Sequence, residues 1–526
     1  MKRLITILIT FLYITAAYGE SFDVDGYGFK IISNSERTVC LVRDNEERKL
    51  DDGRIAVVIP SSVTYQGIDY TVVEIGKNVS VASMANIITL PNTIKRVCDE
   101  AYMYCAFLEE INLPEGLESI GSRAFGSSKV KEIHIPASVR HMGSAPFIWA
   151  DSTKITVDES NPYYDSREGC NAIIETETNK LIQGSAYTRI PESVTSIGVN
   201  AFGAQYGLRR MEIPSSVRVI RDSAFMWCNS LQEVRLHEGL QSIGDKAFMM
   251  CHKLEGLAIP KSVEHIGING IFANSDMKLS VEEGNPFYDS REDCNAVIAS
   301  QNDSLVQGSN LSRIPPSVKI IGDLSFGGCL DITSLRLPEG LTTIGNEAFS
   351  ACYNLAELSL PSTLVRIGSR GFYYCAFSEI TLSEGLESIG SYAFQFCRNL
   401  KQVRFPQTVK SIGEAVFDRC VALDSITVLA TTPPEVATGQ PMLPEEKYAT
   451  TVLTVPEECE EAYRKHEVWG RFKNIVERDL TAIHSPSVAT KKQRTTYDLS
   501  GRHLSARPTK GLYIEDGKVR VASTNN

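Results

Sequence analysis

Residues 231–253, LQEVRLHEGLQSIGDKAFMMCHK, contain one complete unit of a pattern that recurs along most of this 526-residue chain. The spacing of Leu and Val in residues 231–236 favours a short strand with these side chains pointing inward. An Ile-Gly step, an Ala-Phe pair and a cysteine then follow. The glycine is expected to allow a tight reversal that residues with a Cβ atom resist. The unit therefore predicts a strand followed by tight turns.

The unit repeats with a constant period. With the glycine of the Ile-Gly step as a marker, and Cys98 and Arg221 as substitutes in phase, thirteen markers run from Gly76 to Gly413. Neighbouring markers lie 22 or 23 residues apart, except for two intervals of 55 residues. An aromatic residue recurs four positions after the marker, and cysteine recurs seven positions after it. Such columns predict ladders along a stacked solenoid, in which each coil buries its apolar side against its neighbours.

A longer duplication lies above this period. Residues 161–185 and 285–309 are 124 positions apart and are identical at 15 of 25 positions. Both stretches fall in the long intervals, so inserts are expected near 150–189 and 274–313. The array is therefore interpreted as the product of copying a block of four coils.

The Leu-Pro, Val-x-x-Ile-Gly, Ala-Phe and Cys elements together resemble the leucine-rich repeats of BspA-like surface proteins. The stretch IPSSVTY at 59–65 is similar to the family's N-terminal cap, and the stretch from Pro433 to Phe472 is similar to its C-terminal cap. The resemblance implies a right-handed leucine-rich-repeat solenoid, β-rich with short helical turns. We expect an N-terminal β cap at 20–75, the solenoid at 76–428 and a C-terminal cap at 429–478.

The two ends of the chain predict export. Lys2 and Arg3 precede an apolar segment that ends near Ala17 and Gly19, which is typical of a signal peptide at 1–19. Residues 479–526 are expected to form a linker and a tail that resembles type IX secretion sorting signals, with a plain β-hairpin as the alternative. No internal stretch has 18 consecutive apolar residues, so no membrane span is expected. The predicted location is extracellular or on the outer surface of a bacterium.

The cysteines and the acidic residues of the inserts are the side chains in this sequence that could support chemistry. The ladder cysteines are expected to be buried free thiols, because parallel side chains do not face one another. A disulfide among Cys40, Cys170, Cys294 and Cys459 stays open. The carboxylates of the insert segment 161–168, which recurs at 285–292, could serve as an acid and base pair or bind Ca²⁺. The alternative is an Asn-Pro turn in which Asp and Arg satisfy each other.

The sequence predicts a binding protein rather than an enzyme. No HExxH, GxSxG or Walker-type motif occurs, so neither catalysis nor a metal or cofactor is expected. The net charge of −11 argues against a nucleic-acid partner. The resemblance implies a surface adhesin that binds host matrix or cell-surface proteins, or another bacterial surface protein. An envelope protein without a host ligand is one alternative. A carbohydrate-binding solenoid is another, although it should expose aromatic residues on its concave face.

The candidate binding residues lie in the exposed columns of the predicted strands, on the sheet that solenoid curvature is expected to make concave. Arginine is favoured at binding hot spots. The alternative is a solvated face with cross-strand ion pairs. The candidate residues are Arg235, Arg336, Arg404, His134, Glu233, Glu357 and Glu379.

Overall fold

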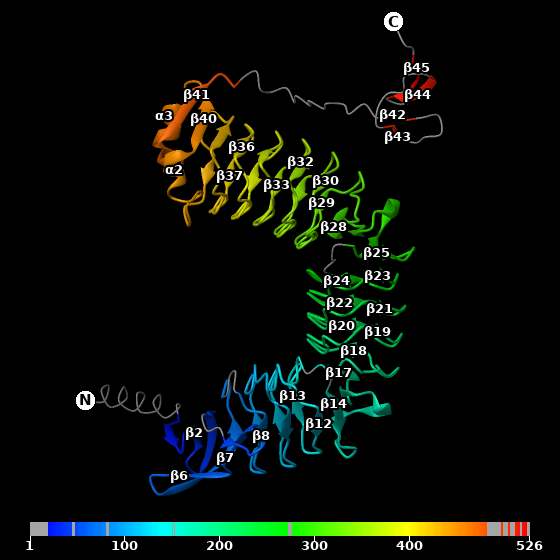
Figure 1. Cartoon of the computed structure of the whole chain (residues 1–526), viewed down its shortest axis with the longest axis vertical. Coiled ribbons are helices and arrows are strands. Elements are labelled where there is room, and N and C mark those ends of the chain that lie inside the picture. The colour runs from blue at the N-terminus through cyan, green and yellow to red at the C-terminus, as the bar shows by residue number, and fades with distance from the viewer. Residues whose placement is uncertain are drawn as a thin grey trace, which may run out of the picture.

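The chain folds into a curved stack of β-coils (Figure 1). This computed structural model describes residues 19–44, 48–79, 84–149, 151, 153–271 and 276–480, together with the backbone of four short strands between 496 and 522. The predicted leucine-rich-repeat solenoid is confirmed. The turns between its strands are hydrogen-bonded turns rather than the expected short helices, since α-helix in the described residues occurs only near the C-terminal end.

Each coil contributes two strands that lie on different sides of the arc. The longer strands, called outer strands here, are β8 (Ile87–Thr89), β10 (Glu110–Asn112), β12 (Glu132–Ile135), β14 (Lys154–Val157), β19 (Arg210–Glu212), β21 (Glu233–Arg235), β23 (Gly256–Ile259), β25 (Lys278–Val281), β30 (Ser334–Arg336), β32 (Glu357–Ser359), β34 (Glu379–Thr381), β36 (Gln402–Phe405) and β38 (Ser425–Val428). The two-residue strands, called inner strands, are β9 (Arg96–Val97), β11 (Ser119–Ile120), β13 (His141–Met142), β18 (Ser196–Ile197), β20 (Val219–Ile220), β22 (Ser242–Ile243), β24 (His265–Ile266), β29 (Ile320–Ile321), β31 (Thr343–Ile344), β33 (Arg366–Ile367), β35 (Ser388–Ile389), β37 (Ser411–Ile412) and β39 (Glu435–Val436).

The two sets of strands form different ladders. The inner strands pair in parallel without a break inside each block of coils, in sheets of eight, seven and nine strands. The outer strands pair only in short groups, with breaks between β10 and β12, β21 and β23, and β32 and β34. Ladder hydrogen bonds need neighbouring strands about 4.8 Å apart. A stack that curves brings its coils closest on the inside, so the ladder stays continuous there and is interrupted on the outside.

The recurring glycine acts by close approach and not by a tight reversal. None of the Ile-Gly glycines is among the residues with positive φ. Instead, a Cβ atom on Gly390 would lie 2.3 Å from the backbone nitrogen of Ser369 in the preceding coil. The same backbone contact would occur at Gly121 and Gly413, at 2.3 and 2.2 Å. The expectation from turn geometry is therefore wrong, and the glycine is needed for the spacing of the coils.

Aromatic and cysteine ladders fill the interior. Phe202, Phe225 and Phe248 stack with ring centroids 5.0 and 5.2 Å apart and interplanar angles of 3° and 1°. The cysteine thiol of a coil donates a hydrogen bond to the carbonyl of the phenylalanine in the preceding coil, as Cys397 does to Phe372 at 3.2 Å. The same bond is made by Cys228, Cys251, Cys352, Cys375 and Cys420, at 3.0–3.4 Å. All thirteen cysteines are free thiols, as predicted for the ladder.

Each insert is a small antiparallel unit that connects two blocks. The first contains β15 (Tyr164–Asp165), the 3-10 helix η1 (Arg167–Gly169), β16 (Ala172–Glu175) and β17 (Lys180–Gly184). The second contains β26 (Tyr288–Asp289), η2 (Arg291–Asp293), β27 (Val297–Ala299) and β28 (Ser304–Gln307). β17 and β28 run parallel to β18 and β29, so each insert starts the next inner sheet. The buried apolar residues accordingly form three clusters that change near the inserts.

Further elements lie at the two ends of the array. The N-terminal end contains β1 (Ser21–Val24), β2 (Tyr27–Ser33), β3 (Thr38–Arg43), β4 (Arg48–Lys49), β5 (Ile55–Val58), β6 (Ser62–Tyr65) and β7 (Ile68–Ile75). The C-terminal end contains α2 (Lys447–Thr450), β40 (Val452–Pro456), α3 (Glu460–Lys465), η3 (Trp469–Arg471) and β41 (Asn474–Arg478). The tail strands are β42 (Thr496–Tyr497), β43 (His503–Leu504), β44 (Gly511–Glu515) and β45 (Lys518–Ala522). Residues 1–18 of the predicted signal peptide at 1–19 lie outside the described residues.

Candidate functional site on the outer sheet

The candidate binding residues project from the outer strands, with buried neighbours between them. In β21, Val234 is buried, whereas Arg235 is exposed. Figure 1 shows the outer strands, such as β21 and β32, on the outside of the arc and the inner strands, such as β22 and β33, nearer its inside. The expectation of a concave binding sheet is therefore wrong. The curvature also explains the breaks in the outer ladder, because it spreads the coils apart on the convex side.

Charged residues form a compact group on β19 and β21. Arg210 pairs in register with Glu233, and Glu212 pairs with Arg235. Glu233 forms ion pairs with Arg235 at 2.8 Å and with Arg210 at 3.6 Å. The hydrogen bond to Glu233 raises the pKa of the Arg235 guanidinium above its ordinary value. Glu233 thus joins both arginines, and Glu212 lies beside Arg235 in register, so that the charges alternate on the convex surface.

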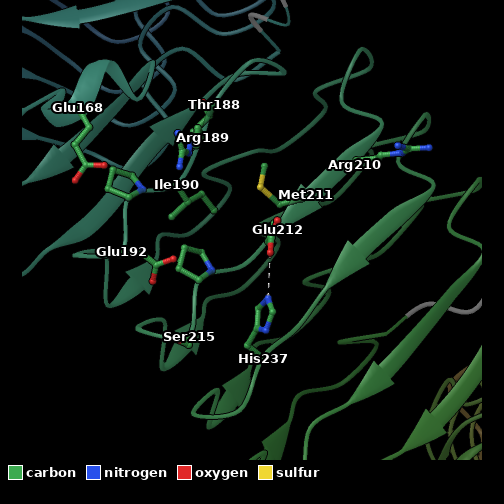
Figure 2. A pocket seen from close by; sticks show the side chains of 12 residues that line it. Glu168, Thr188, Arg189, Ile190, Glu192, Arg210, Met211, Glu212, Ser215 and His237 are labelled. Atoms are coloured by element: carbon green, nitrogen blue, oxygen red, sulfur yellow. Dashed lines mark ion pairs between the residues drawn. The ribbon is translucent and has the colours of Figure 1, made fainter.

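A cavity of about 420 Å³ lies between this group and the first insert (Figure 2). Its lining includes Glu168 from the insert, Glu192, and the Glu212–His237 pair, in which a carboxylate oxygen lies 3.6 Å from the ring nitrogen Nε2. Figure 2 shows Glu212 and His237 facing each other, while Arg210 points away from them. Sequence reasoning missed this cavity, because its walls come from an insert and from the neighbouring coils that contain β19 and β21. The only signal was the position of the insert within the repeat.

A second cavity of about 1090 Å³ is lined by residues of β14, by η1 and by His134. The His134 ring nitrogen Nδ1 is 3.0 Å from the Thr156 hydroxyl, and Nε2 is 3.8 Å from Asp158. Hydrogen bonds from Ser160 lower the pKa of Asp158 below its ordinary value, which keeps this carboxylate charged. Exposed Glu168 lines both cavities. The first insert thus contributes to the walls of both cavities.

Comparison with known proteins identifies the repeat. Residues 62–168, 173–281 and 319–433 match the family described as BspA type leucine-rich repeat region, in six copies. The chain belongs to this family. The BspA-type chain is also similar to a leucine-rich cell surface protein from Faecalibacterium prausnitzii A2-165, at 21% identity and a TM-score of 0.44, over 78% of this chain and 94% of that one.

Two further solved structures resemble the BspA-type chain. One is a leucine-rich repeat protein from Bacteroides ovatus, at 21% identity and a TM-score of 0.35, over 79% of this chain and 100% of that one. The other is the pneumococcal vaccine antigen PcpA, at 18% identity and a TM-score of 0.39, over 88% and 99% of the two chains. A comparison with curated protein sequences found no match.

The other predicted binding residues do not converge on the two cavities of this BspA-type array. Arg336, Glu357 and Glu379 are exposed on β30, β32 and β34, in the block after the second insert. Arg404 is half-buried on β36, and its guanidinium is 3.9 Å from Glu384. The structure therefore separates the predicted column into one group around the first insert and a second group farther along the arc.

The insert carboxylates have a structural role. Asp165 accepts two hydrogen bonds from the Arg167 guanidinium, at 2.5 and 2.7 Å. Burial opposes ionisation of Asp165, but the bonds from Arg167 outweigh it, so its pKa is lowered below the ordinary value. Asp289 and Arg291 repeat the arrangement in the second insert. Asp and Arg satisfying each other, one of the two interpretations of this segment, is what the structure contains.

Within the part of the chain that the structure describes, no three His, Cys, Asp or Glu side chains gather as a metal site would require. The described residues also contain no helix that is long and apolar enough to cross a membrane.

Proposed function

We propose that this chain is an exported, non-enzymatic scaffold on a bacterial surface that binds a protein, as an adhesin would. The observation that carries the proposal is the ordered charge group of β19 and β21 beside the cavity at the first insert. Opposite charges held in register can steer and orient a charged partner. Membership of the BspA-type repeat family and the signal peptide predicted at 1–19 support export. The tail at 479–526 is proposed to act in sorting.

The proposed contact surface includes Arg235, Glu233 and His134 around the first insert. Arg336, Glu357, Glu379 and Arg404 are proposed to extend it only if the partner is long enough to follow the convex arc. The candidate partner is a host matrix or cell-surface protein. The proposal requires neither a cofactor nor a nucleic acid.

Surface plasmon resonance of the chain from residue 20 against immobilised fibronectin, fibrinogen and mucin tests this proposal at about 0.15 M salt, where surface charges are not exaggerated. Saturable binding of one of these is expected, and Arg235→Glu should weaken it about tenfold, as loss of an interfacial arginine does. Arg366→Glu is the control, since Arg366 is exposed on the inner strand β33, outside the proposed contact surface. No binding to any of them, or equal binding by Arg235→Glu, would contradict the proposal.

A further inference from the structure

A cluster of aromatic side chains lies on the turns that follow β31, β33 and β35, away from the outer-sheet site. Tyr374 and Phe396 stack with ring centroids 4.4 Å apart and an interplanar angle of 8°. Tyr373 meets both rings edge-on, at 4.7 and 5.6 Å. Tyr353, which is 52% exposed, meets Tyr374 edge-on at 5.6 Å. The four rings, called the turn-face cluster here, join three successive coils.

The repeat places these side chains at a turn position with positive φ. Tyr374 and Phe396 have φ values of 61° and 62°, and the same position has φ values of 65° at Trp227 and 60° at Ala351. The positive φ therefore belongs to the turn of the repeat and does not by itself mark a site. Because Gly328 and Ala351 occupy the position in other coils, the fold does not require an aromatic residue there.

Charged and polar groups border the rings. The Arg370 guanidinium lies 5.9 Å from the Tyr373 ring centroid and 5.3 Å from that of Tyr392, and it pairs with Glu347 at 3.5 Å. The Tyr392 hydroxyl donates to Glu414 at 3.1 Å. The Arg398 guanidinium lies 5.7 Å from the Phe396 ring centroid. Planar hydrogen-bonding groups thus border a set of stacked rings.

We infer that the turn-face cluster binds a glycan. A pyranose ring presents C–H groups on one face, which stack on an aromatic ring, and hydroxyls at its edge, which need hydrogen-bonding partners. The rings of Tyr374 and Phe396 supply the stacking surface. The side chains of Arg370, Glu347 and Arg398 supply the hydrogen-bonding partners. The site is independent of the outer-sheet proposal, because the two use different surfaces and different residues.

Saturation-transfer NMR of the chain from residue 20 tests the inference with four hexasaccharides, made of β-1,3-glucose, α-mannose, chitin and N-acetyllactosamine units. At least one is expected to bind, and Tyr374→Gly and Phe396→Gly should each weaken that binding about tenfold. Glycine suits the positive φ, so both variants should keep the fold, which thermal unfolding checks. Trp227→Gly is the matched control, since Trp227 has a φ of 65° at the same place in another coil.

Three results would overturn the inference. One is that no hexasaccharide binds. Another is that binding is unchanged in both glycine variants or falls equally in Trp227→Gly. The third is that a proline decapeptide binds the cluster while the sugars do not, which would identify a peptide groove. Arg235→Glu is expected to leave sugar binding unchanged, so failure of this inference and failure of the outer-sheet proposal are distinguishable.

Discussion

The junction between the second and third blocks depends on a tyrosine hydroxyl. The Ile266 amide in β24 donates to the Tyr288 hydroxyl at 2.9 Å, and both residues are less than a tenth exposed. β24 is the last strand of its inner sheet, and β26, which contains Tyr288, is the first strand of the next. The hydroxyl therefore takes the place of the strand carbonyl that an uninterrupted ladder would supply.

Tyr288→Phe should open this junction without disturbing its packing. The phenyl ring keeps the apolar contacts of Tyr288, so the change removes only the acceptor of the Ile266 amide. A buried donor left without a partner costs about 1–3 kcal/mol. We expect about 1.4 kcal/mol at the junction, near the lower end of this range, which corresponds to roughly tenfold faster opening, since 1.4 kcal/mol is a factor of ten.

Native-state hydrogen exchange measures this opening directly. The Ile266 amide should exchange about tenfold faster in Tyr288→Phe, whereas amides in β31 and β33 should be unaffected because solenoid contacts are local. Tyr187→Phe is the control, since Tyr187 is 71% exposed. The Tyr164 hydroxyl hydrogen-bonds the backbone of Met142 at the first junction, so Tyr164→Phe should speed exchange of the Met142 amide in the same way. Unchanged exchange at Ile266 would refute the assigned role of the hydroxyl.

The remaining predictions concern ionisable groups. Burial raises the pKa of the Cys397 thiol to about 12, so thiol reagents at pH 8 should label Cys397 only after unfolding. The free energy of unfolding should fall as the pH rises from about 9 towards 12, because the unfolded chain loses the thiol proton first. Rapid labelling of the folded chain would contradict this. Burial opposes ionisation of Asp289, but the hydrogen bonds from Arg291 keep its pKa below the ordinary value of 3.8. The ionised carboxylate therefore stabilises the folded chain above that pH, and this stabilisation is lost as the pH falls below it. Asp289→Asn should therefore unfold with a smaller acid dependence in urea titrations between pH 5 and 2, and an unchanged dependence would count against the pair.

The repeat period predicted the solenoid, its phenylalanine and cysteine ladders and the two inserts, because each follows from a local pattern repeated at a fixed distance. The hydrogen bond from each ladder thiol to the preceding phenylalanine carbonyl was not predictable, since it joins residues about 26 positions apart whose relative depth depends on the stacking. The role of the glycines was misread for the same reason: Gly390 is limited by Ser369 of another coil and not by its own φ.

The sequence by itself therefore determined which side chains are buried, because a 23-residue period places the same positions against the neighbouring coils. Only the tertiary structure decided the direction of curvature, which depends on the difference in spacing between the inner and outer ladders over many coils. That difference moved Arg235 and the other candidate residues to the convex face. The stacking of the coils placed Glu168 of the first insert and Glu212 of β19 on the wall of one cavity, and it placed Tyr374 beside Phe396.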